Sequence, residues 1–372
     1  MRKGIRSFSR RGLIVIFSFL LPLYLNAGEQ PGHNGENPHS DQTEHGPKEH
    51  SADHEEFVPG EFIIDHIKDH HEWHLITTPD GKHISVPLPV ILYSKYQGIQ
   101  VFMSSKLAHG HEYKNFHISH EGEYKGKIVE RTEEGELYLP LDFSITQVVA
   151  AMIFASIILM ILFIRMGKIY RRKKLVVPSG LNGFLEPMII FIRDEIARPN
   201  IGEKKYERFM PYLLTVFFFI LINNLMGIIP PVIPFGANVT GNIAVTMVLA
   251  VFTLLITQFS GTKDYWKHIF APPGVPLWLS PVMIPVELIG IFVKPFALMV
   301  RLFANITAGH IIILSLVSLI FIFKTIAVAP VSIAIVLFMN ILELLVAFLQ
   351  AYVFTLLSAL FIGLAVKEEV HV

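Results

Sequence analysis

The chain contains no cysteine among its 372 residues. Disulfide bonds and thiolate metal sites are therefore excluded, and the redox compartment is not indicated. The formal net charge is zero, with 31 basic and 31 acidic residues, so charge gives no support to a nucleic-acid-binding function. The sequence also lacks a GxxxxGK(S/T) run, which would cradle nucleotide phosphates. No cofactor is expected.

Histidine and charge are scarce in the second part of the chain. Fourteen of the 17 histidines precede residue 121, whereas most long apolar runs follow residue 142. A run of about 20 apolar residues is long enough to cross a bilayer as a helix. The composition thus predicts a polar N-terminal part and a mainly α-helical integral membrane part over residues 143–366.

Residues 1–27 have the pattern of a secretory signal peptide. A basic start precedes an apolar run from Leu13 to Leu25, and Ala27 supplies the small residue that cleavage requires. An uncleaved membrane anchor is the alternative, and both interpretations place the following segment outside the cytoplasm. Residues 28–56 are expected to form a flexible segment, because they contain too few apolar residues for a core.

Residues 57–142 alternate short apolar runs with turn signals, of which the Thr-Pro-Asp-Gly run at 78–81 is the clearest. They predict a small β-rich extracytoplasmic domain. Near its start, His66, His70 and His74 would share one face of a helix, a spacing suited to a metal ion. A solvated polar stretch without metal is the alternative, and we favour it.

About five segments are predicted to cross the membrane. Residues 143–164 carry no charge, and the next ten residues include six Lys or Arg and no acid. The positive-inside rule places that end in the cytoplasm. The two last spans exceed the length that a bilayer needs, so they are expected to tilt strongly or to lie partly along the membrane plane. The tail, residues 367–372, is then cytoplasmic. The later spans are residues 209–229, 241–259, 286–323 and 325–366.

Two segments between the spans have distinct patterns. Ile189, Ile192 and Ile196 recur at helical spacing beside charged residues, which indicates an amphipathic helix at the membrane interface. Residues 271–285 are rich in proline, which predicts that any regular helix ends before Pro285 and that the next helix begins near Val286.

Arg301 lies deep inside an apolar stretch, with no acidic residue within ten positions on either side. An arginine at the centre of a membrane helix costs between about 2.5 and 17 kcal/mol, depending on the method. It does not lose its proton to escape that cost. The side chain must therefore face water, a polar cavity or the charge of a partner, and it marks a candidate functional site.

Other polar residues accompany Arg301 on the two long helices. Asn305 lies one turn later on the same face, whereas His310, nine residues on, points to the opposite side. Glu343 is the only charged residue of the last span, and Gln350 follows it on the same stripe. An imidazole and a carboxylate on neighbouring apolar helices suggest a proton relay.

Four further polar residues are candidates for the lining of a path. Asn223 and Asn224 lie in the second span, where hydrogen bonding between helices is the alternative. Glu287 and Lys294 lie seven residues apart on the fourth span, where they either pair with each other or line an access path.

The run RLFANITAGH, from Arg301 to His310, resembles subunit a of the F-type ATP synthase. The runs INNLMGIIP (222–230) and FLQAYVF (348–354) resemble the same family, and the resemblance covers about residues 143–366. In that family the arginine faces a rotating ring of c subunits and separates two aqueous half-channels. The resemblance therefore implies proton translocation at Arg301, Asn305, His310, Glu343 and Gln350.

The chain departs from the family pattern at two places. Many bacterial members have Glu at the position of His310 and His at the position of Glu343, so the acid and the base are exchanged here. Gly227 stands where a bacterial aspartate follows the Asn-Leu-Met run. The exchange keeps one acid and one base in the pathway, whereas Gly227 alters the lining of the access channel.

The resemblance implies a non-catalytic stator subunit of the inner membrane, with a periplasmic N-terminal domain. Its partners would be the c-subunit ring, the b subunits of the peripheral stalk and other synthase subunits. Two other hypotheses remain open. One is a secondary transporter whose arginine binds an anionic substrate, although no inverted repeat is visible. The other is a membrane-anchored periplasmic metal-binding protein that uses the N-terminal histidines.

Overall fold

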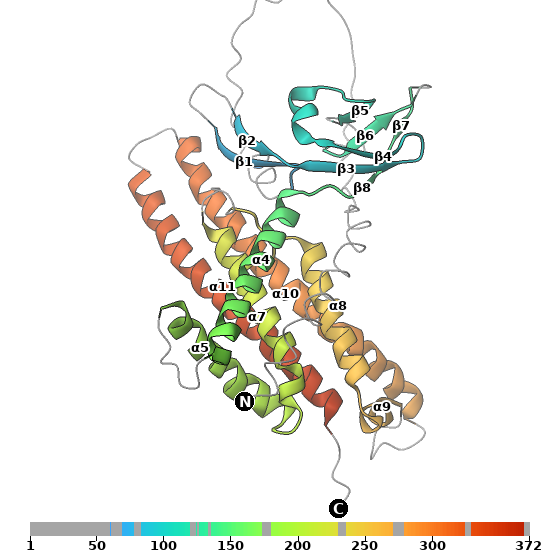
Figure 1. Ribbon diagram of the computed structural model, residues 1–372, viewed down its shortest axis with the longest axis vertical. Helices are drawn as coiled ribbons and strands as arrows, with labels where there is room; N and C mark the ends of the chain where they lie inside the picture. The colour runs from blue at the N-terminus through green and yellow to red at the C-terminus, as the bar shows by residue number, and fades with distance from the viewer. Residues whose placement is uncertain are drawn as a thin grey trace, which may run out of the picture.

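The computed structural model contains a β-rich domain at one end of a bundle of long helices (Figure 1). We call this domain, whose strands lie between Glu72 and Asp142, the outer domain. The predicted signal peptide, the predicted flexible segment and His66 lie outside the described residues. The described residues are 60, 69–77, 83–119, 124, 126–132, 135–172, 180–229, 236–270, 279–323 and 329–367.

The outer domain confirms the predicted β-rich fold. Its strands form a two-stranded sheet β1-β2 and two three-stranded antiparallel sheets, of orders β4-β3-β8 and β5-β6-β7. Two short 3-10 turns, η2 (Ser104–Lys106) and η3 (Ala108–Gly110), follow β4. The strands are β1 (Glu72–Thr77), β2 (His83–Pro87), β3 (Pro89–Ser94), β4 (Gly98–Met103), β5 (Phe116–Ile118), β6 (Ile128–Arg131), β7 (Leu137–Tyr138) and β8 (Leu141–Asp142).

The helix predicted for His66, His70 and His74 is wrong. His74 lies in β1, opposite Ser85 of β2, because the apolar residues of this segment pair with a second strand. Four residues span about 13 Å along a strand but only about 6 Å along a helix, so the backbone leading to His74 does not have the helical spacing. Among the described residues, no group of three His, Cys, Asp or Glu side chains is placed to hold a metal ion.

Five described helices are long and apolar enough to cross a membrane, as predicted. Three short helices, α5 (Leu181–Phe191), α6 (Arg198–Ile201) and α9 (Lys263–Phe270), and the π-helical turn η5 (Ile192–Ala197) connect them. The five long helices are α4 (Gln147–Arg172), α7 (Tyr206–Ile228), α8 (Ile243–Ser260), α10 (Ser280–Phe323) and α11 (Ala329–Val366).

The predicted start of the fourth span is wrong, because α10 begins at Ser280 and continues through Pro285 and Pro295. A proline in the first turn of a helix removes no backbone hydrogen bond, since the first four N–H groups have no partner within the helix. Pro285 and Pro295 stand further in, and each removes one backbone hydrogen bond without ending the helix.

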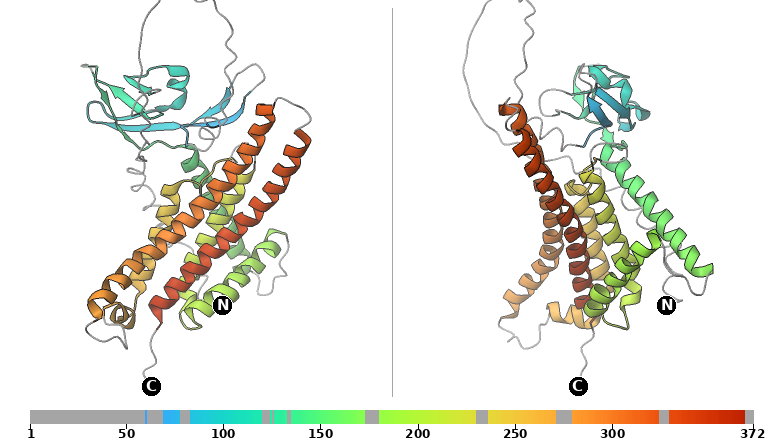
Figure 2. Two further views of the ribbon diagram at one scale, coloured as in Figure 1. Left: turned by 180° about the vertical axis from the view of Figure 1, so that it is seen from behind. Right: turned by 90° about the vertical axis from the view of Figure 1, so that its left-hand side faces the viewer.

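The five long helices differ in how far the protein buries them. The most apolar 18-residue window of α7 is 61% buried, whereas those of α10 and α11 are each 17% buried. Figure 2 shows α10 and α11 side by side along one flank of the bundle. The apolar helical face predicted to lie at the membrane interface before α7 is present. It packs against protein, since Ile192 and Ile196 are fully buried.

The outer domain is tied to the start of α4. The Asp69 carboxylate accepts a hydrogen bond from the backbone N–H of Val148 (3.1 Å), and the His70 carbonyl accepts one from that of Gln147 (2.9 Å). The Asp69 side chain thus caps the helix from 79 residues away. Trp73 is buried against the same end of the bundle, so the domain and the span meet at a fixed junction.

Candidate functional site

α10 turns one face toward the bundle and another away from it. Leu298, Leu302 and Ile306 recur every four residues and are buried, as the helical period requires for a packed stripe. Arg301 and Asn305 are exposed. Both residues therefore lie on the side of α10 that the bundle leaves open, as their spacing predicts.

Arg301 has no acidic partner in the described part of the chain. Neither an ion pair nor a side-chain hydrogen bond links it to any other described residue. Exposed positions within about one turn and a half before it on α10 include the large apolar residues Phe296 and Val300. A bare guanidinium in such a surface is costly inside a membrane, so the arrangement calls for a charge from outside the chain.

His310 and Glu343 form a closed pair on the other side of α10. The His310 Nδ1 atom lies 2.8 Å from the Glu343 Oε1 atom. The two side chains are only 19% and 4% exposed, respectively. A titratable acid and base in hydrogen-bonding contact can pass a proton between them. Since Arg301 is exposed and this pair is largely buried, the nine-residue spacing separates the two as expected.

Two glycines leave room for this pair. A Cβ atom at Gly309 would lie 3.1 Å from the Glu343 Oε1 atom, closer than ordinary van der Waals contact. A Cβ atom at Gly227 would lie 4.0 Å from the His310 Cε1 atom. Position 227, where the family resemblance implied an acid, thus lies beside the imidazole, and a Cβ atom there would make ordinary van der Waals contact with it.

A buried polar stripe on α11 continues from Glu343. Ala347 and Gln350 lie on the same face and are 0% and 6% exposed. The Asn224 amide donates to the Ala347 carbonyl (3.2 Å), and Asn224 also accepts a hydrogen bond from the Thr240 hydroxyl. Asn224 therefore joins helices, which is the alternative to its predicted role as a channel lining. No described residue is hydrogen-bonded to the Gln350 side chain.

Asn223 differs from its neighbour. Its amide donates to the Phe219 carbonyl one turn back (2.7 Å), while its buried Oδ1 atom has no hydrogen-bond partner among the described residues. A buried acceptor without a partner is costly unless water reaches it. Asn223 remains a candidate for the lining of a wet path.

The polar residues occupy three levels along α10. At 1.5 Å per residue, His310 lies about 14 Å from Arg301 toward the outer domain, and Lys294 lies about 10 Å from it in the other direction. α11 runs back antiparallel beside α10 (Figures 1 and 2), which brings Glu343 to the level of His310. Arg301 thus stands between two polar regions.

Residues 149–363 match the family model described as "ATP synthase A chain". ATP synthase subunit a of Chloroherpeton thalassium is 51% identical over 236 residues, which cover 62% of this chain and 69% of that protein. ATP synthase subunit a of Myxococcus xanthus is 44% identical over 287 residues, which cover 75% of this chain and 92% of that protein.

The chain belongs to the ATP synthase A chain family. The resemblance to subunit a of the F-type ATP synthase is thereby confirmed, as are the multi-pass membrane character and the association with ATP synthesis and proton transport. Residues 62–143 match a different model, described as "Domain of unknown function (DUF8433)". The outer domain is therefore an addition to the family's membrane region.

The lower polar region contains residues that the sequence analysis missed. A pocket between α8, α9, α10 and α11 is lined by Thr257, Gln258, Tyr265 and Lys294, among others. Gln258 donates to the Tyr265 hydroxyl (3.2 Å), and burial raises the pKa of Tyr265. Threonines one turn apart, Thr253 and Thr257, were the available signal in this otherwise apolar span.

One of the two predictions for Glu287 and Lys294 was an ion pair between them. The structure has no salt bridge between these two described residues. The Lys294 ammonium instead lies 6.0 Å from the ring centroid of Phe361 on α11. Its side chain borders the pocket, and its role at an access path stays a prediction.

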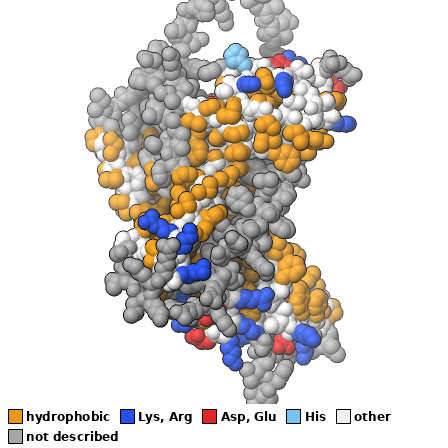
Figure 3. Space-filling view, in the orientation of Figure 1, with side chains coloured by type: hydrophobic (Ala, Val, Ile, Leu, Met, Phe, Trp, Pro, Cys, Tyr) orange, Lys and Arg blue, Asp and Glu red, His pale blue; other side chains and the backbone are white. Residues whose placement is uncertain are grey.

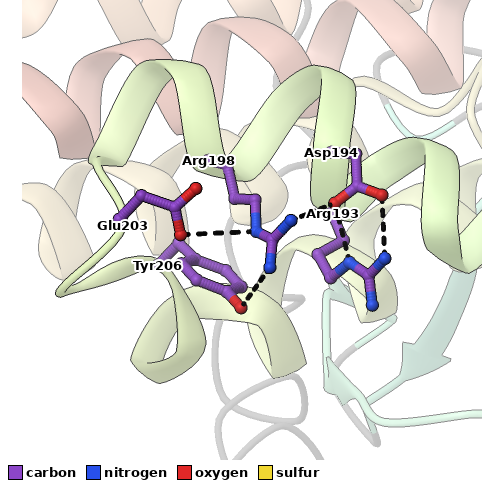
Figure 4. A network of polar contacts seen from close by, with 5 residues as sticks. All are labelled: Arg193, Asp194, Arg198, Glu203 and Tyr206. Carbon is purple, nitrogen blue, oxygen red and sulfur yellow. Dashed lines mark hydrogen bonds and ion pairs between the residues drawn. The ribbon is translucent and has the colours of Figure 1, made fainter. Parts of the chain in front are cut away.

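A charged network lies outside the spans, at the corner between η5 and α7 (Figure 4). The Arg193 guanidinium donates twice to Asp194 (2.8 Å each), and Arg198 donates to the same carboxylate (2.9 Å) and to the Tyr206 hydroxyl (3.3 Å). Glu203 lies 3.6 Å from Arg198. The hydrogen bonds from Arg193 lower the pKa of the Asp194 carboxyl. The contacts are all within the chain, so we assign the network to the fold.

Proposed function

We propose that the chain is the stationary a subunit of a rotary ATP synthase and that its α10–α11 surface faces a rotating ring of c subunits. The observation that supports this most directly is the exposed Arg301 halfway along α10, which has no acidic partner among the described residues. A moving carboxylate on the ring would supply the missing negative charge. A long, little-buried helix pair is also the surface expected for a large apolar partner.

Protons from the outer side reach the ring through His310 and Glu343. The 2.8 Å contact allows the proton to move between the imidazole and the carboxylate. Gln350 and Asn305 lie nearer to the level of Arg301, where they orient the ring carboxylate or its water. Asn223, with its unpaired Oδ1 atom, borders the approach to this pair.

Protons leave on the other side through the pocket lined by Thr257, Gln258, Tyr265 and Lys294. Glu287, about one turn beyond the pocket's edge at Ile291, extends this polar path toward the aqueous phase. Arg301 separates the two paths. Its fixed charge favours the ionised form of the ring carboxylate at the interface and repels protons that would pass directly between the half-channels.

The chain itself carries out no covalent chemistry in this scheme, and ATP is made by other subunits. We place the outer domain in the periplasm, the spans in the inner membrane and the C-terminus in the cytoplasm, with b subunits of the peripheral stalk as further partners. The division into residues 1–27, 28–56, 57–142, 143–366 and 367–372 follows from the same topology.

The proposal is tested by Arg301→Ala in the complete complex, with Lys267→Ala as the control. Lys267 is also an exposed cation, but it lies on α9, outside the spans. We expect Arg301→Ala to abolish ATP synthesis driven by a proton gradient in vesicles, while Lys267→Ala retains it. Both complexes must still co-purify with a ring of c subunits. Synthesis near the unaltered rate in the assembled Arg301→Ala complex would refute the proposal.

A further inference from the structure

One face of the β4-β3-β8 sheet is both apolar and exposed. The strand register places Tyr93 opposite Ile99 and Leu141, and Ile91 opposite Val101. Cross-strand partners lie on one side of a sheet, so these side chains form a single surface, which we call the outer-sheet face. Tyr93, Ile99 and Val101 are 48%, 70% and 64% exposed. None of them carries a charge, so the face exposes mainly apolar surface.

The opposite face of the same sheet is already the core of the domain. Val90, Leu92 and Phe102 are buried there against Phe116 and Ile128 of the third sheet. An antiparallel sheet with one face in water normally carries polar side chains on that face. A sheet that is apolar on both faces therefore indicates a second apolar environment.

Several described charged side chains of the domain lie away from this face, although Lys95 stands just beyond the end of β3. Lys106, Glu112, Lys114 and Arg131 are exposed on the turns and on the strands of the third sheet. Figure 3 shows orange side chains gathered on the side of the outer domain nearest the helices, while Lys and Arg lie toward its far side. The domain is thus polarised across its thickness.

The outer-sheet face points toward the level of the membrane. In Figure 1, β3 lies between the helices and the strands β5, β6 and β7. Since the third sheet covers the inner face of β3 and β4, the other face is turned toward the helical end of the molecule. It is not covered by the bundle, because its side chains remain exposed.

The face is also continuous with a membrane span. Leu141 and Phe143 are 46% and 41% exposed, and α4 begins only four residues after Phe143. α4 in turn exposes Phe154 and Ile157 along its length. Backbone N–H groups at the start of α4 donate hydrogen bonds to residues 69 and 70. These bonds hold the β-rich domain in place at the end of the span.

We infer that the outer-sheet face rests on the outer leaflet of the bilayer, as a monotopic membrane contact of the added domain. Apolar side chains enter the boundary between headgroups and acyl chains, as interfacial segments do. Tyr93 suits the headgroup level, where tyrosine is enriched, and the exposed Lys95, just after the end of β3, reaches lipid phosphates. The inference requires a membrane-spanning chain but not the proposed proton path.

Because the chain has no cysteine, single cysteines report on each face directly. Ile99→Cys and Val101→Cys place an environment-sensitive fluorophore on the outer-sheet face, and Lys106→Cys places the matched control on the charged side. The assembled synthase is reconstituted into vesicles of phosphatidylcholine and phosphatidylglycerol. Quenching is then measured with nitroxide-bearing lipids and with a water-soluble quencher.

We expect the labels at residues 99 and 101 to be quenched by nitroxide lipids and protected from the aqueous quencher, with blue-shifted emission. The label at residue 106 should show the reverse. Equal aqueous quenching at all three sites would overturn the inference. Protection from both quenchers would also overturn it, since that result identifies a protein as the occupant. Each variant is compared with the unaltered complex for proton pumping, so that a folding defect is recognised.

Discussion

Exchanging the two members of the buried pair tests the site most sharply. The variants are His310→Glu, Glu343→His and the double variant with both changes. Each single change leaves two like groups facing each other, whereas the double change restores one acid and one base across the 2.8 Å contact. Gly309 stays in place, so the side chain at position 343 keeps its open neighbour.

The magnitude follows from the burial of the pair. Leaving a buried hydrogen-bonding group without its partner costs about 1–3 kcal/mol, and more where the group is charged. The His310 side chain is 19% exposed and Glu343 only 4%, so partial access to solvent puts each single variant near the lower end of that range. The double variant should recover most of the loss, because the coupling between two contacting residues is not additive.

The assay has two readouts on the assembled complex in membranes. Thermal unfolding measures stability, and ATP-driven proton pumping into inverted vesicles measures coupling. We expect both single variants to lose pumping and stability together, and the double variant to regain both. A double variant that assembles yet pumps no better than the single variants would show that the direction of the acid–base pair matters, and the simple relay would then be wrong.

Two further predictions concern the fold that positions the site. Gly363→Ala should destabilise α11 by about 1–3 kcal/mol, because the new Cβ atom would lie 2.0 Å from the Asn200 backbone oxygen. Gly290→Ala meets nothing within 4 Å and should not lower the thermal unfolding temperature; equal effects would refute the contact. The pair of His71 and Asp142 should make the outer-domain junction pH-dependent. Burial opposes the charged forms, but the hydrogen bond and mutual charge outweigh it, raising the pKa of His71 above 6.5 and lowering that of Asp142 below 3.8. Stabilisation from His71 is therefore complete below pH 6.5 and is lost as pH rises through its higher folded pKa, whereas that from Asp142 is lost only in strong acid. Hydrogen exchange at the start of α4, corrected for its intrinsic rate, should be slower at mildly acidic than at alkaline pH, and His71→Gln should remove that difference; a difference that persists in the variant would assign it to another group.

The spans were predictable because membrane helices are encoded locally. A sufficiently long apolar run satisfies its backbone hydrogen bonds within its own helix. The bilayer core offers no water to satisfy them otherwise, so such a run forms a helix there. The faces of α10 were predictable for the same reason: Arg301, Asn305 and His310 are fixed relative to one another by the helical period alone. The contact between His310 and Glu343 required the family resemblance or the structure, since periodicity gives no register between two helices.

The wrong predictions came from interactions that a local pattern does not contain. The histidine-rich start of the outer domain was assigned a helical spacing, but pairing with β2 draws His74 into a strand. Pro285 was expected to exclude helix, yet the helix starts early enough to include it. The pocket around Tyr265 was missed because it forms where the ends of separate helices meet.

The neighbouring helices α10 and α11 hold Arg301 and Glu343 in opposite ways, and this difference identifies what the site still needs. Glu343 is the one carboxylate of α11, and it already shares a hydrogen bond with His310 of α10. Arg301 stands two and a half turns away on the open side, so it does not share that carboxylate. A protein built only for its own stability would pair the two or replace Arg301 with an apolar residue. The spacing prevents the first, and in the proposed function an acid from another molecule completes the site at Arg301.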